Sequence, residues 1–207
     1  MNRIWRNATV VSLIVTALTA VYAHFFYGHL KPFVWQQVFA VASVLVIAPS
    51  LALSGIAHFW NFADKYIIYR KSLGLLGFYL GLVHVGISLY RSGAVFDAIA
   101  LESLRDVSVM IGYVAVVLFA LMPLFSNPFT IRRIGSNAVR LALRYLGYAG
   151  FVFVLLHAAY LLWPHWVRWC ESGTTMLLPP TLIAVVVGVL VLILRVFLFF
   201  ATRRSSS

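Results

Sequence analysis

Charged residues are scarce in this sequence, and acidic residues are the scarcest of them. Only 5 of 207 residues are Asp or Glu, against 16 Lys or Arg, and charged residues make up 10% of the chain. Soluble domains carry about 25% charged residues, so this composition excludes a soluble globular domain. The lack of carboxylates also disfavours an ion-transport pathway, because such pathways normally place carboxylates inside the membrane.

Cysteine is almost absent as well. The single Cys170 excludes an internal disulfide and any iron–sulfur or zinc site built on cysteines. The net charge of +11 does not require nucleic acid as a partner, because basic residues in short loops set the orientation of membrane proteins. We therefore expect membrane lipid, and no nucleic acid, around the chain.

Long apolar runs are what the chain does have. Hydrophobic residues make up 63% of it, and the mean hydropathy is +0.97. A helix needs about 20 apolar residues to cross the bilayer core, and six segments qualify. The sequence predicts an all-α integral membrane protein, a six-helix bundle forming one domain over 1–207, with its first apolar run retained as a span rather than cleaved. The predicted spans are 8–27, 34–58, 72–90, 107–125, 142–163 and 180–201.

The basic residues between these spans are distributed unevenly. With six spans both termini lie on one side, and the more basic side of a membrane protein faces the cytoplasm. We therefore expect an N-in, C-in orientation. The inner side would hold Arg3, Arg6, Lys65, Arg70, Lys71, Arg132, Arg133, Arg140, Arg144, Arg203 and Arg204, and the outer side only Lys31, Arg91, Arg105 and Arg168.

Two of the six histidines, His84 and His157, lie inside predicted spans. An ionisable residue at such depth is costly and by default indicates a functional site. They follow the inner ends of their spans by 12 and 15 residues, roughly 18 and 23 Å of helix, so both should lie at similar height in the outer half of the membrane. The other four, at span ends or in loops, are His24, His29, His58 and His165; His24 and His58 stay open as extra cofactor ligands.

Glycines accompany both internal histidines on the same helix faces. Small residues let another surface approach the backbone, and histidine is a standard haem ligand. The pattern predicts a flat macrocycle whose iron takes both imidazoles and whose ring lies against the glycines. Plain helix packing uses the same residues and stays open, as does a haem-free transporter or assembly factor. The predicted cofactor contacts are Gly77, Gly81 and Gly150, with Gly74 and Gly147 nearby.

Two stretches resemble the ferric reductase-like transmembrane domain family. In the first, Arg70-Lys71 precedes a Leu-Gly pair, and His84 follows Gly74 by ten residues. The second runs from Ser126-Asn127 through Arg132-Arg133-Ile-Gly135 and Leu143-Arg144-Tyr-Leu-Gly-Tyr148 to His157-Ala-Ala-Tyr160. The resemblance is specific over 70–84 and extends over residues 40–200.

This resemblance implies a haem b electron-transfer subunit of an oxidoreductase system, with one haem per chain on His84 and His157 between spans three and five. In particular, the chain is similar to the bacterial inner-membrane subunit that serves a periplasmic methionine sulfoxide reductase. The implied partner is the molybdopterin-containing catalytic subunit of that reductase, and FMN is a further implied cofactor. Because no glycine-rich nucleotide fingerprint appears, electrons are expected from membrane quinol or a separate flavin reductase.

Two arginines depart from the family pattern. Two-haem relatives stack a second haem on an inner histidine pair, and the corresponding positions here hold Arg70 and Arg144. Arginine does not ligate as a neutral nitrogen, so the inner haem is expected to be absent. The two arginines either set topology or bind an anionic group such as a flavin phosphate or a haem propionate.

The outer loops 91–106 and 164–178 are expected to form the docking surface for the electron acceptor. An acceptor other than methionine sulfoxide reductase, as in a single-haem ferric or metal reductase, is the alternative that the resemblance leaves open. Four residues of these loops are candidates for contact with a partner or with haem propionates: Arg91, Arg105, His165 and Arg168. The alternative is that they are ordinary interfacial residues.

Overall fold

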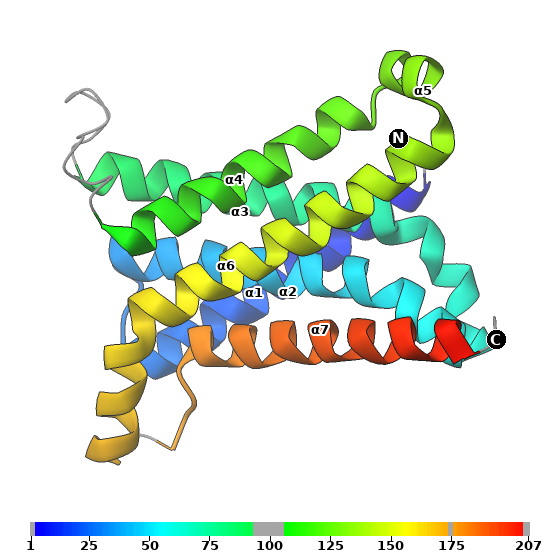
Figure 1. The fold of residues 1–207 in the computed structure, drawn as a ribbon. Helices are drawn as coiled ribbons and strands as arrows, with labels where there is room; N and C mark the ends of the chain where they lie inside the picture. The colour runs from blue at the N-terminus through cyan, green and yellow to red at the C-terminus, as the bar shows by residue number, and fades with distance from the viewer. Residues whose placement is uncertain (1–2, 93–105, 174–175, 205–207) are drawn as a thin grey trace. The chain divides into compact units, whose positions relative to one another are not determined.

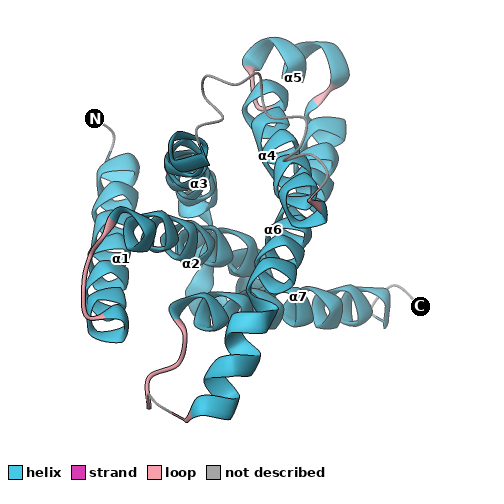
Figure 2. Ribbon diagram, turned by 90° about the vertical axis from the view of Figure 1, so that its left-hand side faces the viewer, coloured by secondary structure: helices cyan, strands magenta, loops and turns pink. Residues whose placement is uncertain are grey.

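The structure is a computed structural model, and it describes residues 3–92, 106–173 and 176–204. In these ranges every regular element is helical (Figure 2). A helix suits a membrane because it satisfies its own backbone N–H and C=O groups. Six helical stretches among the described residues are long and apolar enough to span a membrane, as predicted. In chain order (Figure 1) the elements are α1 (Arg3–Tyr27), α2 (Pro32–Phe59), the 3₁₀ helix η1 (Asn61–Tyr69), α3 (Arg70–Ser92), α4 (Val107–Phe125), α5 (Pro128–Ile134), α6 (Ser136–Ser172) and α7 (Pro180–Arg204).

The chain divides into two compact units. The first comprises Met1–Ser88 and Trp166–Ser207, and the second comprises Leu89–His165. The first unit therefore contains α1, α2, η1 and α7 together with most of α3, and the second contains α4 and α5 together with most of α6. The division within α6 falls directly after Pro164-His165.

Helix α2 forms the core of the first unit. It contacts α1, α7 and η1, and Figure 1 shows it alongside α7. Its buried residues are mainly Ala, Val and Ser, and such small side chains let helix backbones approach closely. The approach to α3 is direct, because the Ser43 hydroxyl donates to the backbone oxygen of Gly77 at 2.8 Å.

Short polar residues start the helices of the second unit. The Asp106 carboxylate accepts a hydrogen bond from the Ser108 amide at 2.8 Å and caps α4. Asn127 caps α5 in the same way, accepting from the Phe129 amide at 3.0 Å. Helix α5 ends at Gly135, whose φ of 90° lies in the region that favours glycine. Figures 1 and 2 show α5 joining α4 to α6, which run side by side.

The fifth span is longer than predicted. Helix α6 begins at Ser136 and continues past Pro164 to Ser172, so the loop predicted from 164 was wrong as far as Ser172. A contact within the first unit explains the continuation. Trp166 is 6% exposed, and its indole N–H donates to the Thr181 hydroxyl at the start of α7 at 3.1 Å. Burial of this tryptophan stabilises a helical turn that the proline alone would discourage.

Candidate functional site

His84 lies half-buried on α3, and the neighbouring helix α2 holds its ring. Its Nδ1 atom lies 2.9 Å from the backbone oxygen of Gln36. A carbonyl oxygen can only accept, so in the neutral ring Nδ1 carries the proton and Nε2 keeps the electron pair. The Gln36 side-chain amide also donates to the Ser88 hydroxyl at 2.7 Å, one helical turn beyond His84. One residue of α2 therefore fixes two positions of α3.

His157 lies half-buried on α6, and α4 holds its ring in a similar way. Its Nδ1 atom lies 2.6 Å from the backbone oxygen of Ser108. The ring also packs against Gly112, because a Cβ atom at that position would lie 3.0 Å from Nδ1 and 3.1 Å from Cε1. A side chain at 112 would therefore force the imidazole to move.

The two histidines thus share one hydrogen-bonding pattern. In each, the Nδ1–H group donates a hydrogen bond to a main-chain oxygen in the first turns of an adjacent helix. Metal-ligating histidines almost always donate their second ring nitrogen to a carbonyl, carboxylate or water, which fixes the tautomer and the ring orientation. The pattern therefore suits coordination of a metal through Nε2.

The glycines predicted to face a cofactor pack against neighbouring helices. A Cβ atom at Gly74 or Gly81 would meet a serine hydroxyl of α2 at 3.1 Å, and one at Gly77 would lie 2.5 Å from the Ile47 side chain. A Cβ atom at Gly150 would lie 3.1 Å from an aromatic ring of α4. Helix packing, which the sequence left open, accounts for all four positions. Their contact with a cofactor stays a prediction.

Arg70 is tied to α2 at the first residue of α3. Its Nε atom donates to the Ser50 backbone oxygen at 3.1 Å, and the Ser50 hydroxyl donates to the Arg70 backbone oxygen at 2.7 Å. These reciprocal bonds anchor the start of the helix that carries His84. Arg144, by contrast, is exposed on α6. Binding of an anionic group by either arginine stays a prediction.

The remaining predicted residues are peripheral or lie outside the described ranges. Arg105 and most of the loop 91–106 belong to the part that is not described, and docking there stays a prediction. Within the described ranges, no three His, Cys, Asp or Glu side chains gather into a group that could hold a metal ion. A metal on His84 and His157 would need other ligands, such as the nitrogens of a porphyrin. The exposed residues are His24, His29, His58, Arg91, His165 and Arg168.

Three residues that position the histidines were missed from the sequence: Gln36, Ser108 and Gly112. Two of them left a trace, since Gln36 is polar within an apolar span and Gly112 is the one glycine of 107–125. Ser108 left none, because it acts through a backbone oxygen that every residue carries.

These features define a class: a multi-pass helical membrane protein with one internal, tautomer-fixed histidine on each of two helices. Two known proteins resemble part of the chain, and both are named as heme-binding subunits. The chain is 35% identical over 77 residues to the protein-methionine-sulfoxide reductase heme-binding subunit MsrQ of Agrobacterium fabrum, which is 37% of this chain and 36% of that protein. It is 30% identical over 104 residues to MsrQ of Brucella anthropi, which is 50% of this chain and 43% of that protein.

The similarity to the haem-binding subunit of a methionine sulfoxide reductase system, which the sequence suggested, is therefore confirmed. It spans less than half the length of the curated relatives it matches. No family model matches the chain.

Proposed function

We propose that this chain is the haem-binding membrane subunit of a methionine sulfoxide reductase system and passes electrons to a separate catalytic subunit. The shared geometry of His84 and His157 carries the proposal. Each ring donates a hydrogen bond from Nδ1–H to a main-chain oxygen and so keeps an electron pair on Nε2. The two similar proteins, both described as heme-binding subunits, support the same function.

The two imidazoles would hold the iron of one haem b through their Nε2 atoms. Neutral histidine is a standard axial ligand of haem iron, so this donor set fits the group. When bound, haem supplies a one-electron ferric–ferrous couple. With both imidazoles as ligands the iron would keep no open position, which would disfavour oxygen binding and favour electron transfer.

The chain's own contribution is orientation and electronic tuning. The main-chain oxygens of Gln36 and Ser108 fix the ring planes and make the imidazoles more basic. A more basic ligand favours the oxidised iron and so lowers the reduction potential. Half-burial of both rings limits solvent access, which acts on the same potential.

The distribution of basic residues supports outward electron delivery in a bacterial inner membrane. With both termini in the cytoplasm, the second and fourth spans, α2 and α4, begin on the periplasmic side. The oxygens that hold His84 and His157 lie near these beginnings. Gln36 is four residues after the first residue of α2, and Ser108 is one residue after the first residue of α4. Both imidazoles would then lie in the outer half of the membrane, close to a periplasmic acceptor.

The acceptor in this proposal is a periplasmic, molybdopterin-containing methionine sulfoxide reductase. The donor is membrane quinol or a flavin reductase, and the phosphate of an FMN cofactor would bind Arg70 or Arg144. The exposed Arg91, His165 and Arg168 belong to the docking surface for the catalytic subunit.

A reduced-minus-oxidised optical spectrum with haem quantified per chain tests the proposal. We expect a b-type spectrum at one haem per chain, and its loss or conversion to high spin in both His84→Ala and His157→Ala. His58→Ala and His165→Ala are matched controls, because both histidines are exposed, and they should keep the wild-type spectrum. A colourless wild-type protein made with ample haem would reject the proposal in favour of a haem-free role, and two haems per chain lost in His58→Ala would reject the single-haem assignment.

The acceptor is tested separately by reoxidation of the reduced protein. Rapid reoxidation by the oxidised catalytic subunit, and slow reoxidation by a ferric chelate, is the expected result. The reverse order would indicate a metal reductase that uses the same haem chemistry.

A further inference from the structure

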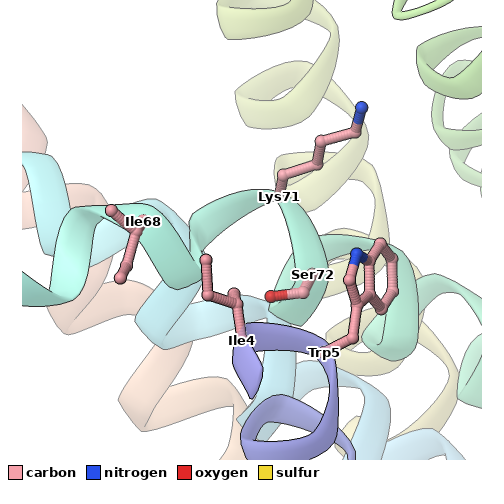
Figure 3. A pocket seen from close by; sticks show the side chains of 5 residues that line it. All are labelled: Ile4, Trp5, Ile68, Lys71 and Ser72. Atoms are coloured by element: carbon pink, nitrogen blue, oxygen red, sulfur yellow. The ribbon is translucent and has the colours of Figure 1, made fainter. Parts of the chain in front are cut away.

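A small pocket opens in the first unit where α1, η1 and α3 meet. Its volume is about 130 Å³, which is below the roughly 300–1,000 Å³ of sites for drug-sized ligands. A flavin or nucleotide ring system is therefore too large for it, whereas a phosphate group is not. Figure 3 shows the Trp5 indole and the Lys71 ammonium, the latter at the tip of an extended side chain. The lining residues are Ile4, Trp5, Ile68, Lys71 and Ser72.

The segments that line this pocket are rich in basic residues. Arg3 and Arg6 flank the two lining residues of α1, and both are exposed. Lys71 is exposed at the pocket, and Lys65 of η1 is exposed with its ammonium 5.0 Å from the centre of the Tyr66 ring. Against these four cations, η1 and the first turns of α1 and α3 contribute one acid, Asp64. The charge therefore favours an anionic ligand.

The side of α1 that carries Ile4 stays apolar and exposed further along the helix. Val11 and Leu18 follow Ile4 by seven and fourteen residues, which places all three on one side of the helix. They are exposed, at 48% for Val11 and 64% for Leu18. The row extends for about 21 Å along the helix axis, which is comparable with the length of a lipid acyl chain. Tryptophan, as at position 5, is typical of the membrane–water interface.

We propose that this pocket binds the phosphate headgroup of an anionic membrane lipid. Lys71, Arg3 and Arg6 supply the positive charge, and the Trp5 indole N–H is a hydrogen-bond donor at the level of the headgroup. The acyl chain follows Ile4, Val11 and Leu18 into the membrane. We expect this binding to be independent of haem, because His84 lies thirteen residues beyond Lys71 in α3, about 20 Å along the helix.

Lipid binding to the purified full-length chain in neutral detergent tests the proposal. Native mass spectrometry would compare phosphatidylglycerol with phosphatidylcholine of the same acyl chains. The pocket variant is Lys71→Gln with Arg6→Gln, and the matched control is Arg133→Gln with Arg140→Gln, which removes two exposed cations from the second unit. A cation that lies next to the headgroup contributes about fivefold to the affinity for an anionic lipid, and Arg133 and Arg140 do not line the pocket.

We expect wild-type and control proteins to prefer phosphatidylglycerol, and the pocket variant to lose about tenfold or more of that affinity while its haem content is unchanged. Trp5→Phe keeps an aromatic ring and should lose a smaller part. Equal binding of the two lipids would overturn the proposal, and so would equal losses in pocket and control variants. Saturable binding of inorganic phosphate that displaces no lipid would assign the pocket to a soluble anion instead. Haem content, measured in parallel, separates failure here from failure of the proposed function.

Discussion

The ring of His157 is held against α4 by two backbone features one turn apart. Its Nδ1 atom lies 2.6 Å from the Ser108 backbone oxygen, and the ring packs on Gly112 four residues later. The imidazole is therefore fixed by the separation of α4 and α6 and not by another side chain. This arrangement makes the histidine sensitive to any substitution that moves the two helices apart.

Gly112 provides the sharpest test of this arrangement. A Cβ atom there would lie 3.0 to 3.1 Å from the His157 ring, so Gly112→Ala should displace the ring slightly and Gly112→Val should displace it more. Changes to groups that orient a metal ligand typically cost 10–100-fold in affinity. We expect haem affinity to fall in that range for Gly112→Val and less for Gly112→Ala, measured by haem titration of the apoprotein.

Gly86→Val is the matched control for this prediction. A Cβ atom at Gly86 would meet nothing within 4 Å. Gly86 follows His84 by two residues, a rotation of about 200°, so it lies on nearly the opposite side of α3. Haem affinity should stay at the wild-type value. Wild-type affinity in Gly112→Val would show that the ring tolerates the added side chain and would contradict the packing argument.

Gly77 tests the contact between α2 and α3. A Cβ atom there would lie 2.5 Å from the Ile47 side chain and 3.1 Å from two backbone atoms of α2. Overpacking of this kind costs about 1–3 kcal/mol, so Gly77→Ala should lower the unfolding temperature in detergent. Adding Ile47→Ala should restore part of the loss, because the side-chain clash disappears while the backbone contacts remain. Complete restoration, or no loss at all, would be inconsistent with this geometry.

Asp106 gives a prediction for pH. Interaction with the Ser108 side chain, followed by the hydrogen bond from the Ser108 amide, holds the pKa of the Asp106 carboxyl below its usual value. The carboxylate therefore stabilises the fold above its unfolded pKa of about 3.9, and this contribution is lost as the pH falls through the lower folded pKa. Unfolding temperatures measured from pH 6 to pH 3 should fall for the wild type. Asp106→Asn keeps an acceptor at the cap and should flatten this dependence. Asp106→Ala should cost about 0.5–2 kcal/mol at pH 6, and the cost should shrink as the wild-type carboxylate becomes protonated.

The bond between Trp166 and Thr181 should be visible in a double-mutant cycle. Trp166→Phe and Thr181→Val each remove the buried hydrogen bond of 3.1 Å, and the double variant removes both partners. We expect a coupling energy of about 0.5–1.5 kcal/mol from unfolding measurements. Additive effects would mean that packing of the tryptophan, and not its N–H, extends α6 beyond Pro164.

The sequence was sufficient for the helices, because span length depends on local composition. The membrane depth and the role of His84 and His157 stay predictions. The sequence was insufficient where one helix meets another. Trp166 showed no sign of its bond to Thr181, so the end of α6 was placed too early. The sequence also did not show that Gly77 of α3 packs against Ile47 of α2, whereas the predicted contact of the α3 glycines with a cofactor stays a prediction. Both cases depend on which elements are neighbours in space, and helical periodicity does not specify the neighbour.

The use of main-chain oxygens by both histidines has an evolutionary consequence. The acceptors at positions 36 and 108 persist whatever side chains those positions carry, provided that the helices keep their backbone. Natural variants can therefore exchange Gln36 or Ser108 without losing the tautomer of either imidazole. Correlated substitution between these positions and the histidines should be weak, so covariation in an alignment would overlook the partners that matter most to them.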